Sequence, residues 1–60
     1  MNRKDFSETL AYCLYICDDN EEIKQELYQI KILFVTDFAQ KKDLKRLKQL
    51  EKQLQKQFRD

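Results

Sequence analysis

Two cysteines are the side chains of this sequence best suited to redox or metal chemistry. Cys13 and Cys17 are the only cysteines among the 60 residues, and the chain contains no histidine. Their i, i+4 spacing places both thiols on one side of a helix with nearly parallel side chains, an awkward geometry for a disulfide. Zinc would need ligands from two chains, because two thiolates do not complete a tetrahedral site. We expect two reduced thiols that face the core, no cofactor and a cytoplasmic protein, with zinc or a disulfide shared between chains as the alternative.

An acidic cluster directly follows the second cysteine. Its carboxylates could suggest calcium, but an EF-hand loop needs a central glycine and the chain has no glycine. Asp19 and Glu22 have instead the spacing of a capping box, and the helix dipole favours acids at a helix N-terminus. We therefore interpret the cluster as the end of one helix and the start of the next. Its members are Asp18, Asp19, Glu21 and Glu22.

No group of residues has the composition of a catalytic site. The missing histidine removes the commonest general base, and neither cysteine has a plausible base beside it. The single serine, Ser7, fits best near the start of a helix. A phosphate-binding glycine loop is impossible without glycine. The sequence therefore predicts a protein that is not an enzyme.

The last third of the chain carries a row of cations. On a helix, six basic side chains recur at spacings of three and four residues, and no acid of that segment interrupts them. We call this row the basic ridge; it consists of Lys41, Lys45, Lys48, Lys52, Lys56 and Arg59. Residues 41–60 hold eight basic and three acidic side chains, whereas residues 1–40 hold four basic and eight acidic ones. The net charge of +1 therefore conceals a dipolar chain.

The basic ridge has two interpretations. It is either the solvated outer face of a helix or a surface for an anionic partner, such as an acidic protein, a phosphate backbone or the acidic hairpin of a second copy. Lysine outnumbers arginine in the ridge, whereas bidentate phosphate and base recognition favours arginine. Nucleic acid is therefore the weaker of the anionic partners.

The elements that must position these residues are all helical. Glycine and proline are both absent, where average usage would give roughly four and three in a chain of this length. Tight hairpin turns lose their usual residues, while lysine, glutamine, glutamate and leucine favour helix. The sequence predicts one small all-α domain over residues 1–60, with an acidic helical hairpin followed by a basic amphipathic helix.

Apolar residues at spacings of three and four define the helices. We expect helices over residues 6–17, 20–37 and 42–58, the first beginning at Asp5 or Ser7. The first should bury Phe6, Leu10, Cys13, Leu14 and Cys17. The second should bury Ile23, Leu27, Ile30, Phe34 and Phe38. The third carries the stripe Leu44, Leu47, Leu54 and Phe58, with Leu50 at its edge.

The chain is expected to turn near residue 40. In one unbroken helix the second and third stripes would point about 140° apart, so they would not serve one flat interface. A new helix capped by Asp37 with Gln40, or by Asp43 alone, would resolve the conflict. One long second helix remains the alternative, because no glycine marks a C-cap.

The three predicted helices present more apolar side chains than they can cover among themselves. A chain of this size buries only about 60% of the surface that its unfolded state exposes. Ile32, Leu33 and Val35 add further apolar side chains beside the stripe of the second helix. We therefore predict a homodimer that shares its core. The apolar interface candidates are Ile32, Leu33, Val35, Leu44, Leu47, Leu50, Leu54 and Phe58.

Binding is the function that remains. The sequence favours a small interaction protein that binds and regulates another macromolecule as an inhibitor, adaptor or anti-repressor, with a protein as the partner. The alternative is a nucleic-acid-binding regulator that uses the basic ridge. A membrane partner is disfavoured, because the chain has no tryptophan, a narrow apolar face and no apolar run of about 18 residues.

Overall fold

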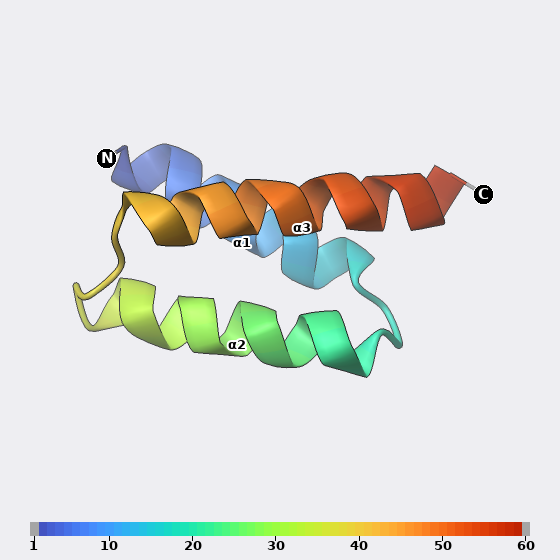
Figure 1. The fold of residues 1–60 in the computed structure, drawn as a ribbon, viewed down its shortest axis with the longest axis horizontal. Coiled ribbons are helices and arrows are strands. Elements are labelled where there is room, and N and C mark those ends of the chain that lie inside the picture. Colours follow the sequence, from blue (N-terminus) through green and yellow to red (C-terminus); the bar gives the residue numbers. More distant parts are fainter. Residues whose placement is uncertain (1, 60) are drawn as a thin grey trace.

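The described part of the chain forms three α-helices that pack against one another (Figure 1). The computed structural model describes residues 2–59, with side chains described for residues 2–57. Within this part of the chain the helices are α1 (Arg3–Ile16), α2 (Glu21–Val35) and α3 (Lys41–Arg59). α1 and α3 run in the same direction and α2 runs opposite to both. The Cα radius of gyration is 10.8 Å. The all-α prediction is confirmed, and the three-helix alternative is the one observed.

Both of the first two helices start on an asparagine. The side chain of Asn2 accepts a hydrogen bond from the backbone N–H of Asp5, at 3.2 Å, so α1 begins before the expected Asp5 or Ser7. Asn20 accepts from the backbone N–H of Ile23, also at 3.2 Å. The predicted Asp19–Glu22 capping box is therefore one residue out of register. Asparagine and aspartate are equally good N-caps, so the sequence did not distinguish neighbouring candidates.

The second helix ends at a turn that normally requires glycine. Asp37 lies in the left-handed region at φ 65°, and the backbone N–H of Phe38 donates to the Leu33 carbonyl at 2.8 Å. The Asp37 N–H donates to the Phe34 carbonyl at 3.2 Å, which completes a Schellman motif. Aspartate tolerates this conformation better than most residues. The chain therefore stops α2 without glycine, and the break near residue 40 is real.

Asp43, one of the two candidates to cap the third helix, lies in its first turn and reaches back to Gln40, so the helix begins before the predicted cap. The Asp43 carboxylate accepts from the backbone N–H of Gln40 at 2.8 Å, and the Gln40 carbonyl accepts from the backbone N–H of Leu44 at 3.2 Å. Asp37 takes no part in this cap. Its carboxylate instead pairs with the guanidinium of Arg3 at 2.6 Å, which ties the start of α1 to the connection between α2 and α3.

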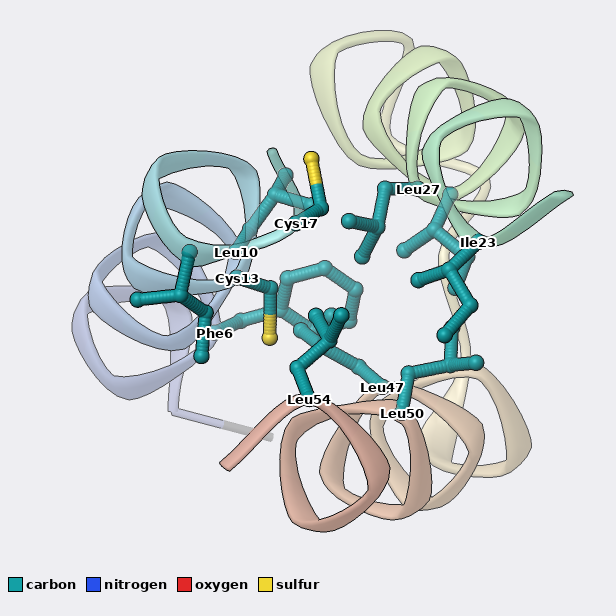
Figure 2. Packing of buried hydrophobic residues seen from close by; sticks show 11 residues of the cluster. Phe6, Leu10, Cys13, Cys17, Ile23, Leu27, Leu47, Leu50 and Leu54 are labelled. Atoms are coloured by element: carbon teal, nitrogen blue, oxygen red, sulfur yellow. The ribbon is translucent and has the colours of Figure 1, made fainter. Parts of the chain in front are cut away.

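The core lies on the axis of the bundle and draws on all three helices (Figure 2). Leucines of α3 point inward towards residues of both α1 and α2. The buried apolar residues are Phe6, Leu10, Cys13, Ile16, Cys17, Ile23, Leu27, Ile30, Leu47, Leu50 and Leu54. Full burial of a leucine contributes roughly 1.5–3 kcal/mol, so this one chain has a substantial core of its own.

The predicted faces differ from this core in a few places. The prediction that Phe38 is buried is wrong. Its side chain is 71% exposed, because α2 ends before Phe38 and the chain turns away. Leu14, Phe34 and Leu44 are only partly buried. Leu50, expected at the edge of its stripe, is 1% exposed. The break near residue 40 frees α3 to rotate, so Leu50 can face the core together with the other leucines.

Candidate interaction surfaces

A groove runs between α1 and α2. It has a volume of about 280 Å³, just below the range of pockets that hold drug-sized ligands, so its size suits an inserted side chain better. Serine and lysine are the only polar residues among those that line it. The lining consists of Ser7, Leu10, Ala11, Leu14, Lys31, Phe34 and Val35.

Large apolar side chains continue this groove over the two helices. Val35 lies on its wall, and Ile32 and Tyr28 follow at helical spacing along the same side of α2. Val35 is 64% exposed and Ile32 60%. On α1, Tyr15 follows Ala11 of the groove at the same spacing and is 83% exposed. We call this set the apolar surface; it consists of Ala11, Leu14, Tyr15, Tyr28, Ile32 and Val35.

Aromatic stacking holds one end of the groove. The ring of Phe34 stacks on Phe6, with centroids 4.7 Å apart and planes inclined by 6°. The guanidinium of Arg3 lies 4.7 Å from the centroid of the Phe34 ring. Because Arg3 also pairs with Asp37, stacking and ion pairing fix the side chains at this end. The groove is therefore a formed feature of the fold.

The two ends of the bundle differ in the charges that they expose. The turn between α1 and α2 lies at one end, whereas the chain start and the connection to α3 lie at the other (Figure 1). The first end carries the exposed acids Asp18, Asp19, Glu21 and Glu22, which we call the acidic turn. The end of α3 also reaches it, because Asn20 donates a hydrogen bond to Gln57, the neighbour of the exposed Lys56. The other end carries the exposed cations Arg3, Lys4, Lys41 and Lys42, which we call the basic end, together with the carboxylates of Asp5, Asp37 and Asp43.

The predicted apolar interface residues are divided between core and surface. Ile32 and Val35 are exposed, and Leu33 and Leu44 are partly buried. The core of the single chain holds Leu47, Leu50 and Leu54, so these three cannot contact a partner in this fold. The side chain of Phe58 lies outside the described residues. Tyr15 and Tyr28 belong to the apolar surface but were missed, although the row of Tyr28, Ile32 and Val35 is visible at helical spacing in the sequence.

The basic ridge lies on the outer side of α3. Five of its lysines are exposed: Lys41, Lys45, Lys48, Lys52 and Lys56. The side chain of Arg59 lies outside the described residues. One acid of another helix reaches the ridge, because the Asp5 carboxylate lies 3.2 Å from the ammonium of Lys48. The ridge is thus a solvated cationic face whose charge is partly offset by α1.

A second ion pair joins the other flank of α3 to α2. Arg46 donates two hydrogen bonds to the carboxylate of Glu26, at 2.8 and 2.9 Å. The hydrogen bond to Arg46 lowers the pKa of Glu26 below its ordinary value. Both side chains are well exposed, so the pair contributes little stability, and its bidentate geometry favours one register of α3 on α2.

The two thiols lie in the core, as predicted. Burial, and to a lesser degree the nearby Glu51 carboxylate, raises the pKa of Cys13 to about 11. The thiol of Cys17 donates to the Leu14 carbonyl at 3.3 Å. A buried thiol with a raised pKa is a poor nucleophile at neutral pH. Among the described residues, no three Cys, Asp or Glu side chains gather as metal ligands.

Comparisons with known proteins identify no relative of this chain. Searches of protein-family models, curated proteins and solved structures found no match. Within the described residues, none of the helices combines the length and the apolar character needed to cross a bilayer. Function must therefore be inferred from the surfaces of the bundle itself.

Proposed function

We propose that this chain is a non-enzymatic interaction protein that regulates another macromolecule by binding it, in the manner of an inhibitor, adaptor or anti-repressor. The proposal places protein binding on the apolar surface. The observation that carries it is the contrast between a closed core and large apolar side chains that stay in solvent. Tyr15, Ile32 and Val35 each expose more than half of their surface, and Val35 lines the groove.

Physical chemistry favours a protein as the occupant of this surface. Contiguous exposed apolar patches on small proteins mark interaction sites, since each buried Å² of apolar area contributes roughly 25 cal/mol. Tyrosines such as Tyr15 and Tyr28 are typical of binding hot spots. An apolar side chain of the partner would enter the groove, and Lys31 on its wall would accommodate a carboxylate at the rim.

Affinity capture from the native host tests this proposal. Tagged wild-type protein is compared with the double variant Ile32→Ser, Val35→Ser, and the co-purifying proteins are quantified by mass spectrometry. The matched control is Gln29→Ser, Gln53→Ser, two exposed positions outside the apolar surface. We expect the apolar variant to lose proteins that the control keeps. Identical sets from all three baits would contradict the proposal.

A second candidate function is nucleic-acid binding through the basic ridge, favoured by its five exposed lysines. Association with generic duplex DNA is measured at two salt concentrations, where phosphate contacts give a steep fall in affinity with salt. Glutamine keeps helix propensity, so a quadruple glutamine variant should remain folded and lose both affinity and salt dependence. Its positions are Lys45, Lys48, Lys52 and Lys56. A salt-independent or undetectable association of the wild type would remove this candidate.

A further inference from the structure

We infer that the apolar surface binds a second copy of this chain, in an antiparallel dimer whose two-fold axis crosses the helices at right angles. In this arrangement α1 packs on α1 of the partner subunit, and α2 on its α2, each pair running in opposite directions. The inference rests on that part of the proposed function which places protein binding on the apolar surface, and it names a second copy as the protein bound there. It also moves the dimer interface away from the leucines of α3, which the single chain already buries.

The size of the face fits a dimer. The bundle measures 34 × 18 × 16 Å, and the chain exposes 4676 Å². A stable interface takes about 800 Å² from each partner, roughly a sixth of this surface. One long side of the bundle covers about 600 Å² in flat projection, and side-chain relief raises the accessible area above that. Contact along the whole α1–α2 side therefore supplies enough area.

Charge selects the antiparallel arrangement. A two-fold axis across the helices places the acidic turn of each copy beside Arg3 and Lys4 of the other, the two cations of the basic end that belong to α1. An axis along the helices would instead place the two acidic turns together, with repulsion between like charges. Lys4 and Asp18 are equally far in sequence from Ala11 on α1, so they exchange places about an axis near Ala11. Lys4 then lies beside Asp18 of the partner subunit.

The dimer leaves α3 on the outside of both copies. The core side of α3 faces α1 and α2 of its own chain (Figure 2). The lysines of the basic ridge are exposed. Two basic ridges would thus lie on opposite faces of the dimer.

Sedimentation equilibrium tests the dimer. We expect wild-type protein at micromolar concentration to have twice the 7.4 kDa mass of the chain, and the Ile32→Ser, Val35→Ser variant to be a monomer. The Gln29→Ser, Gln53→Ser control should remain a dimer. Circular dichroism is used to check that each variant keeps its helices. A folded wild-type monomer, or a dimer that the apolar variant leaves intact, would overturn the inference.

A cross-link tests the orientation. Ala11 is exposed near the expected axis, so Ala11→Cys brings two introduced thiols together in the antiparallel dimer. We expect a disulfide-linked dimer under mild oxidation. The control Gln53→Cys, on exposed α3, should give at most slow linkage, and the buried native thiols should contribute little. Rapid linkage through the control and none through Ala11→Cys would overturn the antiparallel arrangement.

The two proposals fail in different ways. A wild-type monomer whose captured proteins depend on Ile32 and Val35 overturns the dimer and supports protein binding at the apolar surface. A dimer that Ile32→Ser, Val35→Ser dissociates supports the inference even if the captured set does not change. In that case the regulated macromolecule binds elsewhere, and the basic ridge is the next surface to test.

Discussion

Replacing Leu50 with alanine should destabilise the chain by about 3 kcal/mol. Leu50 is 1% exposed and is one of the leucines of α3 that point into the core (Figure 2). Each carbon that the substitution removes carries ~0.8 kcal/mol of transfer free energy, which gives about 2.4 kcal/mol in all. The cavity left behind adds to this cost, and the total lies within the range of about 2–5 kcal/mol for such substitutions. A 60-residue domain has roughly 3–9 kcal/mol in total. The variant therefore loses a third or more of its stability.

Urea unfolding followed by circular dichroism measures this loss. The matched comparison is Phe38→Ala, because Phe38 is 71% exposed and its truncation should cost less than about 1 kcal/mol. Both variants are measured at two protein concentrations, so that any contribution of association is separated from folding. Equal losses from the two substitutions would show that Leu50 is not a core residue, and the single-chain core described above would be refuted.

Three further substitutions test local features of the fold. Cys13 has a pKa raised from 9.0 to about 11, so the stability from its neutral thiol is present below pH 9 and lost as pH rises through 11. Cys13→Ala should remove that part of the pH profile of urea unfolding, on the order of 2 kcal/mol, and an unchanged profile would refute the assignment. Asn20→Ala should cost about 1 kcal/mol and speed amide exchange at Ile23; unchanged exchange would contradict the cap. Asp37→Ala should be less stable than Asp37→Gly by about 1 kcal/mol in thermal unfolding, because φ is positive there; equal stability would contradict the Schellman turn.

Helix content and the core faces were predictable from sequence. The absence of glycine and proline, together with apolar spacings of three and four, identified all three segments. Their ends were less predictable, since Asn20 and Asp19 are adjacent and equally good N-caps. The end of α2 depended on Asp37 adopting a conformation that usually marks glycine, and no local pattern announces that choice.

The candidate site was only partly predictable. The exposed lysines of α3 follow directly from their position opposite the leucines. The apolar surface depends on tertiary packing, because α3 makes its most extensive contact with α1 and leaves the outer side of the α1–α2 pair uncovered. Spacing alone shows that Ile32 and Val35 lie off the core face of α2. Only the assembled bundle shows that they continue a groove shared with Ala11 and Leu14.

The central claim is that the apolar surface is the protein-binding surface of this chain. Nuclear magnetic resonance tests it most directly, through contacts between copies in a sample that mixes isotope-labelled and unlabelled protein at about 100 μM, where a dimer stable at micromolar concentration is fully formed. We predict that the intermolecular contacts cluster on Ala11, Tyr15, Tyr28, Ile32 and Val35. Contacts between copies confined to the lysine face of α3 would contradict the account.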